Sequence, residues 1–127
     1  MANVLVIDDS GFSRKRVTSA VAEAGHTITE ATNGQEGLNL IAAVSFDCVV
    51  SDNLMPVMEG VEMLRHLRAG GNMIPVVMCS ADIQDSTRSQ CEELGVTRFI
   101  AKPFKPDELI DAVADAIAAG KECAACD

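Results

Sequence analysis

The feature that most constrains the fold of this chain is a regular alternation between short apolar runs and segments with helical periodicity. The runs at 3–9, 46–50 and 74–80 are largely apolar, which is typical of strands buried on both faces of a sheet. The run at 26–31 alternates, as a half-exposed strand does, and a fifth run covers 96–102. Each run is followed by a segment that can form a helix, so the sequence predicts five successive βα units.

Five consecutive βα units predict an α/β protein with a parallel sheet and helices on both faces. Because crossover connections are right-handed, few arrangements other than a doubly wound five-stranded sheet are available. A TIM barrel needs eight such units and about twice the length. The chain has 127 residues, and we predict one domain over residues 1–120 followed by a short tail at 121–127.

The predicted helices differ in the strength of their signals. Gly25 fits the C-terminal cap of the first helix, and Pro106 suits the first position of the last one. The segment 83–95 has a much thinner apolar face, with only three residues to anchor it: Ile83, Cys91 and Leu94. We therefore expect the fourth helix to be the most weakly packed.

Charge and hydropathy exclude two classes of partner. The net charge of −9 argues against nucleic acid, because phosphate backbones attract a basic surface. No apolar run approaches the ~20 residues that a membrane-spanning helix needs. The N-terminus lacks the basic and apolar regions of a signal peptide, so a cytoplasmic location is expected.

The five cysteines lie in three different contexts. Cys48 and Cys79 lie inside apolar runs and are predicted to be small core residues, whereas Cys91 lies in a polar helical stretch. Cys123 and Cys126 form a C-x-x-C pair in the tail. A redox or metal function for that pair needs a second pair or a βα context, so two free thiols at a frayed end are the favoured interpretation.

Polar side chains stand at the ends of four of the five predicted strands. Asp8 and Asp9 end the first strand, Asp52 the third, Ser80 the fourth and Lys102 the fifth. Ligands bind beyond the carboxyl ends of the strands in open α/β sheets, so we expect these five side chains to share one shallow cleft. Each alone has an ordinary explanation, as a cap, a turn residue or a surface lysine, but chance placement of all five is improbable.

Three carboxylates in one cleft repel one another and favour a bound cation. Hard oxygen ligands with room for water suit Mg²⁺. Three aspartates and one lysine sum to −2, so one Mg²⁺ makes the cleft about neutral. A cleft with a metal, an ammonium and a hydroxyl suits a phosphoryl group, and one aspartate can act as the nucleophile that forms an aspartyl phosphate.

With these motifs the chain resembles the receiver domain of two-component response regulators, close to the free-standing chemotaxis type. The resemblance runs from "VLVIDDS" through "SDNLMPVMEG" and "VVMCSA" to "FIAKPF" and the final helix. It implies the flavodoxin-like strand order 2-1-3-4-5. It also implies a signalling domain that accepts a phosphoryl group and changes its binding surface. Such a domain promotes only its own phosphorylation and dephosphorylation, so we expect a phosphoacceptor domain and not an enzyme.

The resemblance assigns roles to individual residues of the cleft. Asp52 is the phosphoacceptor, and Asp9 and Asp52 ligate Mg²⁺ directly. The backbone carbonyl of Leu54 is the third protein ligand, and Asp8 acts through water. The remaining assignments are phosphoryl contacts from Ser80 and Lys102, a cis peptide bond before Pro103 and an aromatic switch residue, Phe99.

Some positions depart from the commonest pattern of the family. Ser80 stands where threonine is frequent and keeps the hydroxyl, whereas Phe99 stands where tyrosine is frequent and loses a phenolic hydrogen bond. Leu54 and Asp82 flank the site at positions that tune dephosphorylation, and their opposite character leaves the lifetime of the phosphoryl group open.

The resemblance also indicates partners. These are a sensor histidine kinase or histidine phosphotransfer protein as donor, and a downstream target protein. The basic cluster at 13–16 has two equally weighted interpretations, as a surface that steers the kinase or as an ordinary solvated face. The region 95–117 lacks the paired charges of the branch of the family that dimerises, so we predict a monomer.

Three other readings compete with a phosphorylated receiver. A Mg²⁺-dependent phosphatase with an aspartate nucleophile favours a D-x-D spacing, but Asp8 and Asp9 are adjacent and Asp52 is distant. A flavin-binding module needs a phosphate-binding loop after the first strand, where this chain has acids. A receiver-like module that is never phosphorylated usually loses one of the site residues, and here all five are present.

Overall fold

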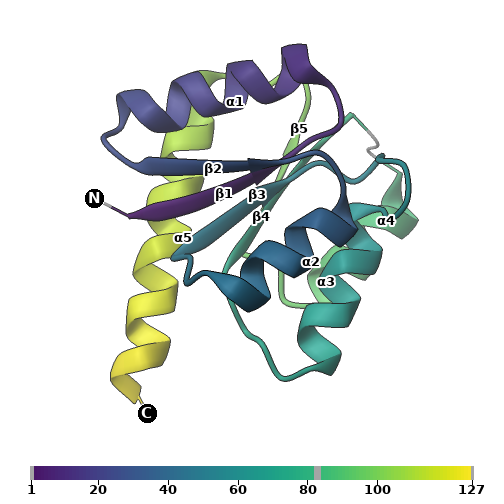
Figure 1. Ribbon diagram of the computed structural model, residues 1–127, viewed down its shortest axis with the longest axis vertical. Helices are drawn as coiled ribbons and strands as arrows, with labels where there is room; N and C mark the ends of the chain where they lie inside the picture. Colours follow the sequence, from purple (N-terminus) through teal and green to yellow (C-terminus); the bar gives the residue numbers. More distant parts are fainter. Residues whose placement is uncertain (1, 82–83, 127) are drawn as a thin grey trace.

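The structure, a computed structural model, describes residues 2–81 and 84–126, and for 120–126 only the backbone. Asp82 and Ile83 lie outside the described residues, and so do the side chains of Cys123 and Cys126. Strands and helices alternate along the described chain (Figure 1). The strands are β1 (Asn3–Ile7), β2 (Thr27–Ala31), β3 (Cys48–Ser51), β4 (Val76–Ser80) and β5 (Arg98–Ala101). The helices are α1 (Gly11–Glu23), α2 (Gly34–Ala43), α3 (Gly60–Ala69), α4 (Asp85–Glu93) and α5 (Pro106–Cys126).

The five strands form one parallel sheet in the order β2-β1-β3-β4-β5, as predicted. In the register of the sheet, Ile7 of β1 is opposite Ser51 of β3, and Ser80 of β4 is opposite Ala101 of β5. The order reverses between β1 and β3, which places the ends of these two strands side by side at the topological switch point.

Helices cover both faces of the sheet, so the core has two layers (Figure 1). Alternate residues of β1 divide between them: Val4 and Val6 pack toward α1 and α5, whereas Leu5 and Ile7 pack toward α2, α3 and α4. These four side chains are at most 1% exposed. Burying an aliphatic side chain of this size contributes about 1.5–3 kcal/mol. A one-residue slip of the strand would bring polar Asn3 or Asp8 into one of these layers, which makes the slip costly.

The observed strands are shorter than the predicted apolar runs. Asp8 and Asp9 lie beyond β1, and β3 begins at Cys48 rather than at residue 46. Asp47 lies before β3 and pairs with the backbone of Asn3. Its Oδ2 accepts the Asn3 N–H at 2.8 Å, and its own N–H donates to the Asn3 carbonyl. At the C-terminus α5 continues to Cys126. Its backbone is therefore helical over most of the predicted tail, in a stretch rich in alanine, the strongest helix former.

Two helix ends agree with their sequence signals. Gly25 follows α1 with a left-handed backbone, at φ +93°, and Pro106 opens α5.

The fourth helix is thinly anchored, as predicted, since Cys91 is the one fully buried residue in α4. Among the helices of the described chain, none has the length and apolar character needed to cross a membrane.

Candidate functional site

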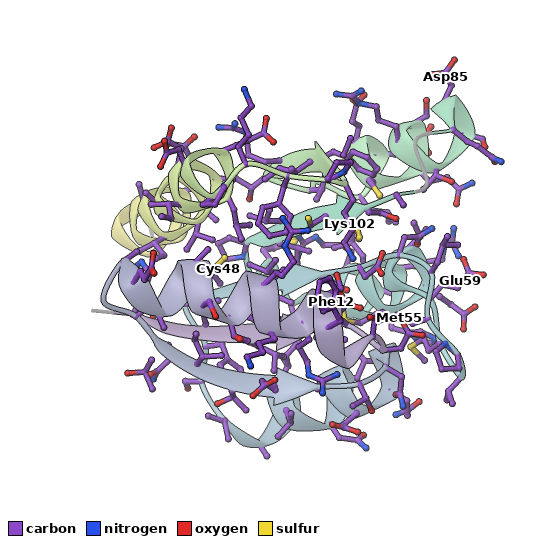
Figure 2. The ribbon with its side chains drawn as sticks, turned by 90° about the horizontal axis from the view of Figure 1, so that it is seen from above. Phe12, Cys48, Met55, Glu59, Asp85 and Lys102 are labelled. Carbon is purple, nitrogen blue, oxygen red and sulfur yellow. The ribbon has the colours of Figure 1, made fainter. Side chains whose placement is uncertain are left out.

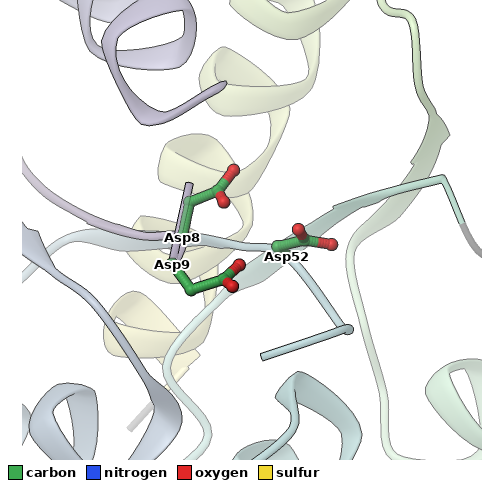
Figure 3. A group of neighbouring side chains, drawn as sticks. All are labelled: Asp8, Asp9 and Asp52. Carbon is green, nitrogen blue, oxygen red and sulfur yellow. The ribbon is translucent and has the colours of Figure 1, made fainter. Parts of the chain in front are cut away.

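Three carboxylates gather at the carboxyl ends of β1 and β3 (Figure 3). Asp8 and Asp9 directly follow β1, and Asp52 directly follows β3, its neighbour in the sheet. Each of the three offers an oxygen, and these oxygens all lie within 4.8 Å of one another. Asp8 is buried, Asp52 is half-buried and Asp9 is exposed. The cluster therefore opens to solvent on the side of Asp9.

Lys102 reaches this cluster from the end of β5. Its Nζ donates to Oδ2 of Asp8 at 2.9 Å and to Oδ2 of Asp52 at 3.2 Å. Burial by itself lowers the pKa of Lys102, but the hydrogen bond to Asp8 and the charge of Asp52 outweigh it and leave the pKa above its ordinary value. The lysine is therefore a firmly charged ammonium between two carboxylates.

The third hydrogen bond of the ammonium goes to a residue that the sequence did not single out. Nζ donates to Oγ of Ser13 at 2.7 Å, so all three N–H bonds of Lys102 have acceptors. Ser13 lies in the first turn of α1, and it stands in the basic cluster that was interpreted as a surface. No local signal marks this serine, because the contact joins segments 89 positions apart.

Arg14 also faces inward and fixes Asp8 in place. Its guanidinium donates to the main-chain carbonyl of Asp8 at 2.7 Å and pairs with the carboxylate of Glu30 at 2.8 Å. The cluster at 13–16 is thus divided, because Ser13 and Arg14 belong to the interior of the site while Lys15 and Arg16 are exposed. Only the second pair remains available to steer a partner.

The loop between β3 and α3 holds Asp52 through Asn53, another residue that no pattern in the sequence marks. Asn53 is 2% exposed, and its Oδ1 accepts the N–H of Val61 at 3.0 Å. Its carbonyl accepts the N–H of Gly60 at 2.9 Å. A Cβ at Gly60 would collide with the carbonyl oxygen of Asp52, so only glycine allows α3 to start this close to the acid.

The remaining predicted residues surround the acids at different depths. Ser80 is fully buried at the end of β4, and its carbonyl accepts the N–H of Lys102 at 2.9 Å. Leu54 is 52% exposed in the loop after Asp52. The Lys102–Pro103 peptide bond is cis. Phe99 is half-buried on the face of α2 to α4, where the Arg88 guanidinium carbon lies 5.6 Å from the centre of its ring.

A shallow hollow adjoins the cluster on the side of α1. It has a volume of about 240 Å³ and lies between Phe12, Arg16, Lys102 and Phe104, among other residues. Phe12 is 78% exposed at the start of α1. Phe12 and Lys102 both lie toward the carboxyl end of the sheet, whereas Cys48 lies toward the opposite end (Figure 2).

The donor set fits a small divalent cation. Carboxylate oxygens are the ligands that Mg²⁺ prefers, and the open side at Asp9 leaves room for the water that Mg²⁺ retains. The ammonium of Lys102 occupies the inner side of the cluster, toward Asp8. The arrangement can thus hold a metal among the three carboxylates and direct the positive charge of Lys102 at Asp52.

Comparison with known proteins gives a consistent result. The family model described as "Response regulator receiver domain" matches residues 4–114. Protein CcdB of Bacillus subtilis is 34% identical over 114 residues, which are 89% of this chain and 95% of that protein. Chemotaxis protein CheY of Thermotoga maritima is 30% identical and covers 87% of this chain and 92% of its own length.

Solved structures agree with the sequence relatives. The receiver domain of Francisella response regulator 1452 superposes with a TM-score of 0.88 at 30% identity, covering 94% of this chain and 98% of that one. Several other curated relatives are longer, and this chain spans less than half of their length.

Proposed function

This chain belongs to the response regulator receiver domain family, and we propose that Asp52 accepts a phosphoryl group from the phosphohistidine of a sensor histidine kinase or a histidine phosphotransfer protein. A carboxylate oxygen of Asp52 forms the new P–O bond. The P–N bond to the donor breaks, and its electron pair returns to the imidazole. The transfer takes place in the cytoplasm.

The residues around Asp52 have three different roles in the proposed transfer. Asp9, Asp52 and the carbonyl of Leu54 would hold Mg²⁺, with Asp8 acting through water, and the ion supplies positive charge that offsets the phosphoryl oxygens. Lys102 stabilises the negative charge on the transferred group. Ser80 donates its hydroxyl to a phosphoryl oxygen.

The observation that supports this proposal most strongly is the contact between Lys102 and Asp52. The Lys102 ammonium is 3.2 Å from Oδ2 of Asp52 and also pairs with the buried carboxylate of Asp8. An ammonium held this close to Asp52 can stabilise the negative charge of a phosphoryl group that arrives there.

The phosphoacceptor can be tested with acetyl phosphate and Mg²⁺. We expect the intact mass of the wild-type protein to rise by one phosphate and that of Asp52→Asn to stay unchanged. Asp111→Asn, which removes an exposed acid of α5, is the matched control and should be labelled like wild type. Full labelling of Asp52→Asn would show that another residue is the acceptor.

The metal site can be tested separately through Asp9. Asp9→Ala should abolish both Mg²⁺ binding in calorimetry and labelling by acetyl phosphate. Because it removes one of three crowded carboxylates, the metal-free variant should melt at the same temperature as wild type or higher. A large loss of thermal stability without Mg²⁺ would contradict the electrostatic account of the cluster.

The phosphorylated domain then acts by binding a downstream target protein. The surface expected to change is formed by α4, β5 and α5, because Phe99 connects this surface to the site. Phe99 is three residues before Lys102 in the chain and packs beside α4. A pull-down that compares the phosphorylated protein with Asp52→Asn would identify the target.

A further inference from the structure

The hydroxyl of Ser13 is part of a closed ring of hydrogen bonds beside Asp52. The N–H of Ser10 donates to Oδ1 of Asp8 at 3.0 Å, and the N–H of Ser13 donates to Oγ of Ser10 at 3.3 Å. Lys102 closes the ring by donating to Oγ of Ser13 at 2.7 Å and to Oδ2 of Asp8 at 2.9 Å. The first turn of α1, the end of β1 and the end of β5 are therefore fixed to one another around a single ammonium.

The bond to Ser13 is the shortest of the three that Lys102 donates, and the bond to Asp52, at 3.2 Å, is the longest. A phosphoryl group on Asp52 requires the ammonium to redirect one N–H toward a phosphoryl oxygen, since all three are already in use. The bond to Asp52 is the one that can be exchanged at least cost. The bonds to Ser13 and Asp8 can stay as they are.

A lysine at this place needs such an anchor for two reasons. Its ammonium is a point charge on a flexible four-carbon stem, so two carboxylates alone leave its position along the cleft poorly defined. The N-terminal end of a helix also carries partial positive charge, which disfavours a cation beside the first turn of α1. The hydroxyl oxygen of Ser13 places an acceptor where that turn would otherwise repel the lysine.

We propose that Ser13 is a positioning residue that, together with Asp8, holds the Lys102 ammonium in place to meet the phosphoryl oxygens arriving at Asp52. The inference rests on the proposed function, because it concerns the same transfer. Ser13 does not touch the phosphoryl group in this account and acts through Lys102 alone.

Three variants test the hydroxyl. The rate of labelling by acetyl phosphate is measured by intact mass at saturating Mg²⁺, so that metal affinity cannot contribute. Ser13→Ala should be labelled about three- to tenfold more slowly, as expected for the loss of one charged hydrogen bond whose place water can partly take. Ser13→Thr, which keeps the hydroxyl, should stay within about twofold of wild type. Ser19→Ala, on an exposed position of the same helix, should match wild type.

A double-mutant cycle then tests whether Ser13 acts through Lys102. Unfolding by urea is measured without metal for wild type, Ser13→Ala, Lys102→Met and the double variant, a measurement that does not depend on activity. The unfolding equilibrium constants should be non-additive, because either single change already removes the contact.

The outcomes separate the two proposals. A wild-type protein that gains no phosphate contradicts the proposed function itself. If wild type is labelled, this inference alone is overturned by an equal rate for Ser13→Ala, by a Ser13→Thr variant as slow as Ser13→Ala, or by additive effects in the cycle.

Discussion

Val57 has a backbone conformation that its side chain disfavours. It has φ +68°, the one positive φ of a residue other than glycine in the described chain, and its side chain is 78% exposed. A β-branched residue in this left-handed region costs about 1–3 kcal/mol. Because the exposed side chain gains little from packing, the strain is not offset locally, and it lies five residues after Asp52.

We therefore expect Val57→Gly to raise the free energy of unfolding by about 1 kcal/mol, since the relief of strain exceeds the added flexibility of the unfolded chain. Urea denaturation followed by circular dichroism measures this change. Val44→Gly is the matched control: Val44 is also exposed but has an ordinary extended backbone at φ −132°, so the same substitution should destabilise. A loss of stability as large for Val57→Gly as for Val44→Gly would show that the conformation of Val57 carries no strain.

Two buried thiols make stability depend on alkaline pH. Burial raises the pKa of Cys48 to about 12, with a smaller contribution from Asp47. Burial also raises the pKa of Cys79 to about 12. Above the ordinary value of 9.0 the unfolded chain loses these two protons while the folded chain retains them, so the free energy of unfolding falls as pH rises from 9 toward 12.

At pH 10 the two thiols together should lower stability by about 3 kcal/mol relative to pH 8. The loss begins at the ordinary pKa of 9.0, so each group contributes about 1.4 kcal/mol over the one pH unit from 9 to 10. The measurement is urea denaturation at both pH values. The double variant Cys48→Ala/Cys79→Ala is less stable at pH 8 but should lose less between the two pH values. Equal losses for both proteins would rule out the thiols as the cause.

At the scale of elements, α4 is the part most suited to have two states. Cys91 is its one fully buried residue, and the N-cap residue Gln84 makes no capping hydrogen bond through its side chain to the described part of the helix. Arg88 of α4 lies over the ring of Phe99, and also pairs weakly with Glu92 at 3.9 Å. A helix with so few buried contacts has a small free-energy difference between alternative positions.

We expect the phosphoryl mimic beryllofluoride to move α4 and Phe99 together. The Ser80 hydroxyl turns toward the mimic and leaves space beside β4, into which Phe99 can swing without burying an unpaired polar group, because its ring has no hydroxyl. Structures with and without beryllofluoride should therefore differ in the Ser80 and Phe99 rotamers and in the position of α4. Unchanged rotamers and an unmoved helix would show that this coupling is absent.

At the scale of the whole molecule, the arginines of α4 and β5 both pair with acids of the same chain. Arg98 of β5 pairs with Asp115 of α5 at 2.8 Å, and Arg88 pairs with Glu92 inside α4. The net charge of −9 adds general repulsion between copies. We therefore expect a monomer both before and after phosphorylation. Light scattering at micromolar concentration checks this, and a stable dimer in either state would contradict it.

The sequence by itself determined the layout of the molecule. Strand and helix periods differ, so the runs at 3–9, 46–50 and 74–80 could be recognised as strands without any tertiary information. The parallel arrangement then brings strand ends to one edge, which is why the cluster of Asp8, Asp9 and Asp52 could be predicted. The boundaries were less certain, because residues such as Asp47 pair with the backbone of a distant strand.

Only the tertiary structure decided which neighbours complete the site. Ser13 and Arg14 looked like surface residues of a basic cluster, yet one holds Lys102 and the other fixes Asp8. Asn53 was not singled out from the sequence, yet it is buried and joins the loop to α3. The physical reason is the separation of the partners along the chain. Periodicity reports which residues of one segment are buried, whereas the hydrogen bond between Ser13 and Lys102 depends on how closely two elements approach after the sheet has formed.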